Sequence, residues 1–328
     1  MLASHGSFPA GRGVLCRQGG EEQHLLPSPF LHRFALLTAA STLCLILAGA
    51  LVVGNQAGLA VPDWPLSFGT WMPPMEGGVF YEHGHRMVAT SVGALTIVLA
   101  AWIWRREPRR WVRRLAWLAL GAVILQGVLG GITVLYRLPA PVSIGHACLA
   151  QLFFCLTLSL VLFTSRSWDL ASGSFEDAHA PSFRHLCAAT SGAIFLQLVL
   201  GAALRHGVFD FQLHAVWAFV VACLVGWVVV RAMTDLPEQR PLQRLALSLG
   251  ILIIVQIALG VASLLLRQTQ DTAAAVPTQT LVWITTLHVA AGALALGISW
   301  VLTLLAFRRT RAHRSLAPMQ QHAEKSPA

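Results

Sequence analysis

The run LAWLALGAVILQGVLGGITVL, residues 115–135, contains no Asp, Glu, Lys or Arg. Because an α-helix rises about 1.5 Å per residue, about 20 apolar residues are enough to cross the hydrocarbon core of a bilayer. Working outward from this run, we find seven more of the same kind. The eight runs cover residues 34–53, 87–104, 115–135, 144–164, 186–204, 213–230, 245–266 and 281–307. We therefore predict an all-α membrane protein with eight transmembrane helices.

The composition excludes several other classes of protein. Hydrophobic residues make up 55% of the chain and charged residues 11%, and the mean hydropathy is +0.64. These values are far from those of a water-soluble globular protein. A membrane β-barrel would show short strands of alternating polarity instead of long apolar runs. The longest connection, residues 54–86, is too short for an ordinary separate domain.

Positive residues gather on one side of the predicted membrane. On the side of the 54–86 connection there are only four of the 23 Lys and Arg residues: Arg86, Arg137, Arg205 and Arg267. The other 19 lie on the side of the two chain ends, which the positive-inside rule places in the cytoplasm. We therefore expect both termini to be cytoplasmic. The net charge of +9 then reflects topology and not a nucleic-acid partner.

A repeated pattern divides the chain into two halves. Three of the odd-numbered runs carry Gln followed four residues later by Gly, at Gln126 and Gly130, Gln197 and Gly201, and Gln256 and Gly260. In the first run, Ala50 and Gly54 are assigned to the same register. Each glycine precedes a connection to a helix that begins near a histidine. We predict two pseudo-symmetric four-helix bundles, 34–164 and 186–307, with a linker at 165–185 and cytoplasmic tails at 1–33 and 308–328.

The four histidines of this pattern are His85, His146, His214 and His288. The eight runs contain no charged residue, which disfavours a proton-coupled transporter because that class needs an ionisable group inside the membrane. Two histidines per half, on different helices, suit a bundle that holds haem between opposed imidazoles. Zinc is less suitable because the chain has no local Cys and His cluster of the usual spacing. A single such histidine can also be an ordinary interfacial residue.

The four arginines opposite the cytoplasmic side have two interpretations. Each could bind a haem propionate, since the guanidinium group binds carboxylates in a bidentate manner; the four are Arg86, Arg137, Arg205 and Arg267. They could equally be interfacial residues that extend toward water. His83 and His206 also lie on this side, and their roles are left open.

The most distinctive segment is 58–86. It contains Pro62-Asp63-Trp64-Pro65-Leu66 and ends with Glu82-His83-Gly84-His85-Arg86. This segment resembles the haem A synthase family, whose Glu-x-x-His-Arg motif is matched by Glu82, His85 and Arg86. The remaining three family histidines fall on His146, His214 and His288. The duplicated eight-helix topology covers essentially the whole chain.

The resemblance implies an oxidoreductase of cytochrome oxidase assembly that converts the C8 methyl of haem O into the formyl group of haem A, with oxygen from water. It implies haem b on His214 and His288, the haem O substrate on His85 and His146, and Glu82 as a catalytic acid or base. It also implies the bacterial inner membrane and a haem O synthase acting upstream. The electron acceptor, for which a quinone is one candidate, and a homo-oligomeric state are left open.

Two departures from the family and two alternatives remain. Where many bacterial members have a cysteine pair around the loop, this chain has Val61 and Ser67, and His214 is followed by Ala215 where the family often has Arg. The main alternative is a bis-histidine haem b protein that transfers electrons to or from quinone. A small-molecule permease is disfavoured by the uncharged spans. A prenyl transferase is excluded because the chain has no DxxxD pair for magnesium.

Overall fold

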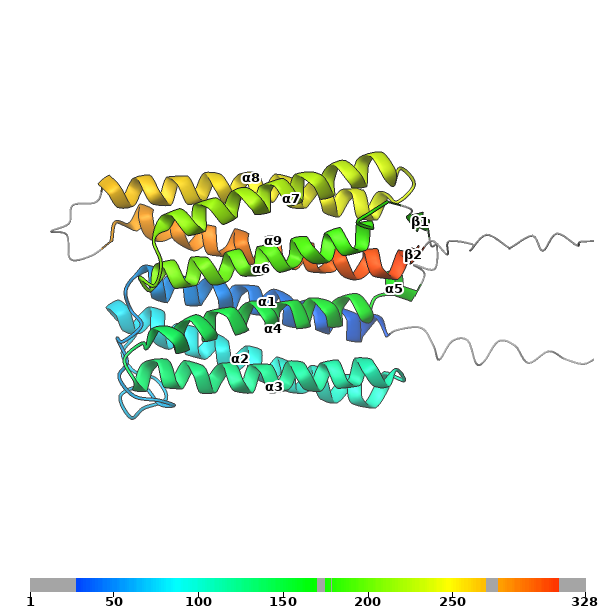
Figure 1. The fold of residues 1–328 in the computed structure, drawn as a ribbon. Helices are drawn as coiled ribbons and strands as arrows, with labels where there is room; N and C mark the ends of the chain where they lie inside the picture. The colour runs from blue at the N-terminus through cyan, green and yellow to red at the C-terminus, as the bar shows by residue number, and fades with distance from the viewer. Residues whose placement is uncertain (1–27, 170–174, 178, 270–276, 313–328) are drawn as a thin grey trace, which may run out of the picture.

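The computed structural model describes residues 28–169, 175–177, 179–269 and 277–312. Within them, eight helices are long and apolar enough to cross a membrane. Figure 1 shows them running side by side along one direction: α1 (Pro29–Gly54), α2 (Gly77–Arg106), α3 (Arg110–Leu135), α4 (Ala140–Phe163), α6 (Phe183–Arg205), α7 (Phe211–Asp235), α8 (Arg240–Thr269) and α9 (Gln279–Arg309). The prediction of a multi-pass, essentially all-α membrane protein is confirmed.

Three short elements lie at the end of the bundle where the chain ends emerge. Helix α5 covers Arg166–Asp169, and strands β1 (Phe175–Asp177) and β2 (Thr310–Ala312) pair in parallel. The predicted linker 165–185 therefore contains α5, β1 and the start of α6. Strand β2 ties this segment to the end of α9.

The helices extend beyond the apolar runs that predicted them. Helix α1 begins at Pro29, inside the predicted 1–33 tail, and α2 begins at Gly77, ten residues before the predicted span. A hydropathy window ends where charged residues begin, whereas a helix continues as long as its backbone N–H and C=O groups form hydrogen bonds. Glu82, His85 and Arg86 therefore lie within the first turns of α2. Residues 1–27 and 313–328 of the predicted tails lie outside the described residues.

Each half forms a closed ring of four helices. In the first half, α1, α2, α3 and α4 each pack on two neighbours within the half, and α6, α7, α8 and α9 repeat this arrangement. The halves meet through α1 with α9, α4 with α6, and α4 with α9. Exchanging the two halves maps this set of contacts onto itself, so the arrangement is consistent with pseudo-symmetric bundles.

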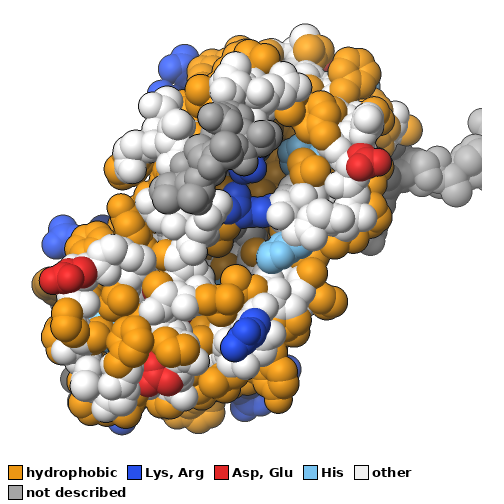
Figure 2. Space-filling view, turned by 90° about the vertical axis from the view of Figure 1, so that its left-hand side faces the viewer, with side chains coloured by type: hydrophobic (Ala, Val, Ile, Leu, Met, Phe, Trp, Pro, Cys, Tyr) orange, Lys and Arg blue, Asp and Glu red, His pale blue; other side chains and the backbone are white. Residues whose placement is uncertain are grey.

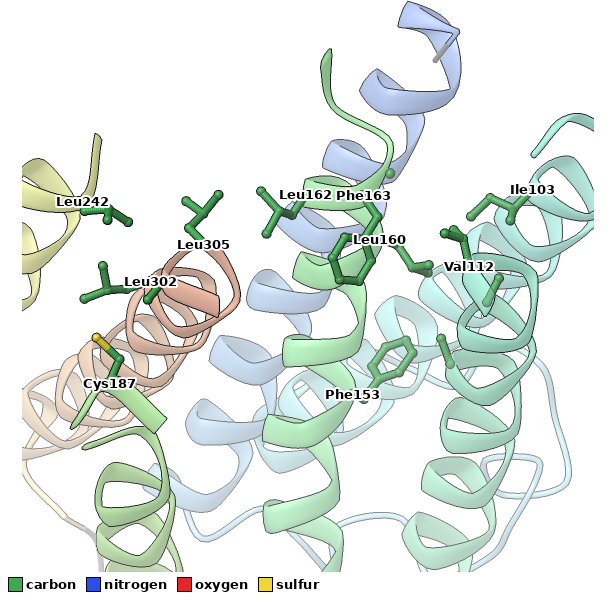
Figure 3. Packing of buried hydrophobic residues seen from close by; sticks show 14 of the residues in the cluster. Ile103, Val112, Phe153, Leu160, Leu162, Phe163, Cys187, Leu242, Leu302 and Leu305 are labelled. Carbon is green, nitrogen blue, oxygen red and sulfur yellow. The ribbon is translucent and has the colours of Figure 1, made fainter. Parts of the chain in front are cut away.

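The main apolar core lies at the end of the bundle where the chain ends emerge. It is built from Ile103, Val112 and Phe163 in the first half and from Leu186, Leu242 and Leu305 in the second. Figure 3 shows side chains of this cluster on helices of both halves, among them Val112 and Phe163 in the first half and Leu242 and Leu305 in the second. This end is closed by close-packed side chains, which leaves the opposite end for polar and ionisable groups.

Candidate functional site

Four histidine rings each rest against a glycine of the preceding helix. His85 lies against Gly49, His146 against Gly130, His214 against Gly201, and His288 against Gly260. A Cβ built on each glycine would lie 3.1, 3.2, 3.1 and 3.1 Å, respectively, from Cε1 of the histidine. A methyl group would be too close to the ring at such a distance. The absence of a side chain on each glycine therefore makes space for the imidazole ring. The same contact, made four times, is the structural counterpart of the sequence repeat.

This contact corrects the register predicted for the first helix. We predicted Ala50 and Gly54 at the repeat positions, but Gly49 faces His85 and Gly54 packs against Val282 of α9. The first helix has two glycines five residues apart, and spacing alone does not reveal which one faces the histidine. The position four residues before the contacting glycine is therefore Leu45 in α1, whereas α3, α6 and α8 have glutamine at the corresponding position.

The three glutamines contact the histidines that they precede. Nε2 of Gln126 donates to the backbone carbonyl of His146 at 2.9 Å, and Nε2 of Gln197 donates to that of His214 at 3.0 Å. Nε2 of Gln256 lies 3.4 Å from Nε2 of His288. These amides link α4, α7 and α9 to the helices that precede them, at the level of the histidine rings.

His288 is oriented for metal binding through Nε2. Its Nδ1 lies 3.1 Å from the backbone carbonyl of Gln256, to which an Nδ1–H donates. A ring that uses Nδ1–H in this way carries its lone pair on Nε2, which is the usual arrangement of histidine ligands. In this structure that lone pair faces the Gln256 amide, and a metal ion bound at Nε2 would replace this contact.

The two histidines of the second half face each other at a spacing that fits one metal ion. The ring centres of His214 and His288 are 6.4 Å apart and the rings are inclined by 66°. A metal ion binds an imidazole nitrogen at about 2 Å and the ring centre lies about 1 Å behind it, so two opposed ligands have centres about 6 Å apart. In the first half, His85 and His146 are close enough to interact electrostatically.

Two histidines per centre fit haem better than a bare metal ion. In the described parts of the chain, no group of three or more His, Cys, Asp or Glu side chains could hold a metal. A porphyrin supplies four ligands of its own and needs only two axial imidazoles, which each half offers. The residues present therefore fit haem.

Glu82 and Arg86 hold the loop that joins α1 to α2, residues 55–76, here called the α1–α2 loop. Glu82 is buried, and it accepts hydrogen bonds from the backbone N–H of Val61 at 2.9 Å and from Arg86 at 2.6 Å. Arg86 also donates to three loop carbonyls, those of Asp63 at 2.7 Å, Leu66 at 2.9 Å and Val61 at 3.2 Å. The Glu82-x-x-His85-Arg86 motif thus joins the start of α2 to the Pro62–Leu66 segment.

Asp63 fixes a tight turn within this loop. Its carboxylate accepts hydrogen bonds from the backbone N–H groups of Phe68 at 2.7 Å and Gly69 at 2.8 Å. Both residues have positive φ, 53° for Phe68 and 71° for Gly69, a conformation that is costly for phenylalanine. The hydrogen bonds from Gly69 and Phe68 lower the pKa of Asp63 from its ordinary value of 3.8.

The α1–α2 loop covers the first half. The indole ring of Trp64 lies so close to Gly131 of α3 that a Cβ there would be 2.7 Å from it. Gly131 follows Gly130, the residue against which the His146 ring rests. The loop therefore packs directly above the histidine level of the first half. The corresponding connection of the second half is only the segment between Arg205 and Phe211.

His83 is a residue whose environment the sequence did not predict. The side chain is buried, and its Nδ1 lies 2.8 Å from Oγ of Ser67, which is also buried. The position of His83 beside Glu82 gave no signal of burial, because burial depends on how the loop folds back onto α2.

The four arginines have different environments. Arg86 is engaged with the loop and Glu82, as described above. Arg205 donates to the backbone carbonyl of Val53 at 2.6 Å, which joins the two halves, and it interacts electrostatically with Arg267. Arg137 is exposed, in a turn with positive φ after α3. Figure 2, which shows this end of the bundle, has basic and histidine side chains around a hollow in its middle.

Comparisons with known proteins agree with these features. Residues 75–210 match the family model described as Cytochrome oxidase assembly protein. A curated protein named Heme A synthase from Symbiobacterium thermophilum is 31% identical over 182 residues, which cover 54% of this chain and 59% of that protein. Proteins of the same name from Halalkalibacterium halodurans and Roseobacter denitrificans are 32% and 36% identical, over 42% and 34% of this chain and 46% and 32% of their own lengths. The matched part spans about half the length of the first two relatives.

Proposed function

We propose that this chain, which is similar to proteins named Heme A synthase, converts haem O to haem A by oxidising the C8 methyl group to a formyl group. Overall, the methyl group and one water molecule give the formyl group, four electrons and four protons; two of the protons come from the methyl group and two from the water. The electrons leave to an external acceptor, such as a quinone. The observation that carries this proposal is the set of four histidines, two in each half, each held by the same glycine contact, with the rings of His214 and His288 facing each other.

The differences between the halves support different tasks for them. Only the first half has the long α1–α2 loop with Glu82 and Trp64 beside its histidines. We assign the haem O substrate to His85 and His146, and haem b to His214 and His288. When bound, haem b supplies a redox centre that can accept and pass on electrons.

Glu82 is the residue that we propose moves protons during methyl oxidation. It precedes His85 by three residues, which places both on the same face of α2. Each carboxylate oxygen accepts one hydrogen bond in the structure, so each retains capacity to accept a proton from water or from a hydroxylated substrate. The loop that Glu82 holds keeps bulk water away from this reaction.

Arg205, Arg267 and Arg137 remain our candidates for binding haem propionates. Arg205 and Arg267 are exposed, and their charges interact with each other, so an anion between them would be stabilised. Arg86 is a weaker candidate because its guanidinium group already donates to four acceptors. We further propose that this end of the bundle faces away from the cytoplasm.

Haem analysis of whole cells tests the proposed function. The chain is produced together with a haem O synthase in cells that make no haem A, and the haems are extracted and separated by chromatography. We expect haem A, accompanied by a hydroxylated intermediate. A protein that binds haem b while haem O accumulates unchanged would instead be the electron-transfer protein considered above.

A further inference from the structure

We propose that Leu45 makes His85 the histidine of the first half that releases haem, while the Gln126 amide anchors its partner His146 through the backbone carbonyl. This inference rests on the proposed function and deepens it, because a synthase must release one haem as product and retain the other. It identifies a residue that determines which of the two histidines of the first half releases the haem.

The glycine contacts show which positions correspond in the four helix pairs, each made of a glycine-bearing helix and the histidine-bearing helix that follows it. Counting four residues back from Gly130, Gly201 and Gly260 leads to Gln126, Gln197 and Gln256. The same count from Gly49 leads to Leu45. Because each glycine touches the histidine of its own unit at nearly the same distance, the four positions are structurally equivalent and Leu45 occupies the place of a glutamine.

The glutamines restrain motion of the histidine-bearing helices. Gln126 and Gln197 donate to the backbone carbonyls of His146 and His214, and the Gln256 amide lies against His288 and close to Gly292. Such interhelical hydrogen bonds stabilise the packing of membrane helices. For a histidine to move away from a bound haem, its helix must break or stretch this link.

His85 lacks this amide restraint. Leu45 has no hydrogen-bonding side chain, and it packs with the main apolar cluster. The turn that carries His85 is instead tied to the α1–α2 loop through Glu82 and through the neighbouring Arg86. The His85 ring rests against Gly49 and interacts with the backbone of Leu45, but no side-chain amide of α1 holds the backbone of His85. The turn that carries His85 can therefore move together with the loop, whereas the backbone of His146 remains linked to α3. Opening of the loop and loss of the ligand would then be one coupled event.

The test is the rate at which haem leaves the full-length protein. The purified chain is loaded with haem b, and excess apomyoglobin captures the haem that is released. We expect two kinetic phases, of which His85→Ala removes or greatly accelerates the faster one. Leu45→Gln should slow the faster phase by about 3- to 20-fold, the range expected from one interhelical hydrogen bond. Gln126→Leu should accelerate the same phase, because it removes the anchor of the second ligand.

Two comparisons keep this test decisive if a variant folds poorly. Leu47→Gln adds the same polar group two residues further along α1, on a different face of the helix, and should leave both phases unchanged. An unchanged fast phase in Leu45→Gln, or one equal to that of Leu47→Gln, would overturn the inference, as would an unchanged rate in Gln126→Leu. A chain that binds no haem at all would instead contradict the proposed function.

Discussion

The glycines beside the histidines give the sharpest test at the scale of single residues. Gly201→Ala places a methyl group 3.1 Å from Cε1 of His214, and such overpacking costs about 1–3 kcal/mol. We expect weaker haem binding in the second half and an altered low-spin spectrum. Gly192→Ala on the same helix is the matched control, because a Cβ there meets nothing within 4 Å. Equal spectra for the two variants would show that the glycine contact does not position the ring.

Glu82 has two roles that mutation can separate. Glu82→Gln removes the proton acceptor and also weakens the bond to Arg86, whereas Arg86→Gln disturbs the loop but retains the carboxylate. We expect haem content to persist in both variants. Conversion of haem O should fall by about two or more orders of magnitude in Glu82→Gln and by less in Arg86→Gln. The measurement is the ratio of haem A to haem O extracted from cells. Equal losses would show that Glu82 acts only by holding the loop.

At the scale of elements, the α1–α2 loop should depend on the Asp63 carboxylate. Asp63→Asn retains one acceptor oxygen, but the charge that favours two N–H donors is lost. We expect faster cleavage of this loop in limited proteolysis, with the rest of the protein intact. Because the pKa of Asp63 is lowered in the folded loop, its stabilising contribution is full above the ordinary value of 3.8. It is lost as the pH falls below that value through the folded pKa. A cleavage rate equal to that of the parent would contradict this role.

The helices were predictable from sequence, but the packing of the loop was not. Charge-free runs identify the membrane spans, and the Gln and Gly pattern identifies three of the four histidine units because both lie within regular helices. The register of Gly49 was missed because it depends on which of two glycines meets the facing helix. The burial of His83 and the bonds of Arg86 depend on how the α1–α2 loop folds back, which hydropathy does not report.

At the scale of the whole molecule, we predict that the α1–α2 loop lies outside the cytoplasm. Ser67 is buried, so the exposed Met72 is the better labelling position. Met72→Cys should react with a membrane-impermeant thiol reagent in intact cells. Glu238→Cys, in the exposed α7–α8 connection, should react only after lysis. Labelling of Glu238→Cys in intact cells, with labelling of Met72→Cys only after lysis, would show that the α1–α2 loop lies in the cytoplasm.

The two-centre arrangement is the central claim, and the number of haems per chain tests it most directly. We expect the purified parent protein, saturated with haem, to hold two low-spin haems, because each half provides two imidazoles. His214→Ala with His288→Ala should remove one haem and leave the other, and His85→Ala with His146→Ala should remove the complementary one. Full haem content in either double variant, or loss of both haems in each of two well-folded variants, would contradict one bis-histidine centre in each half.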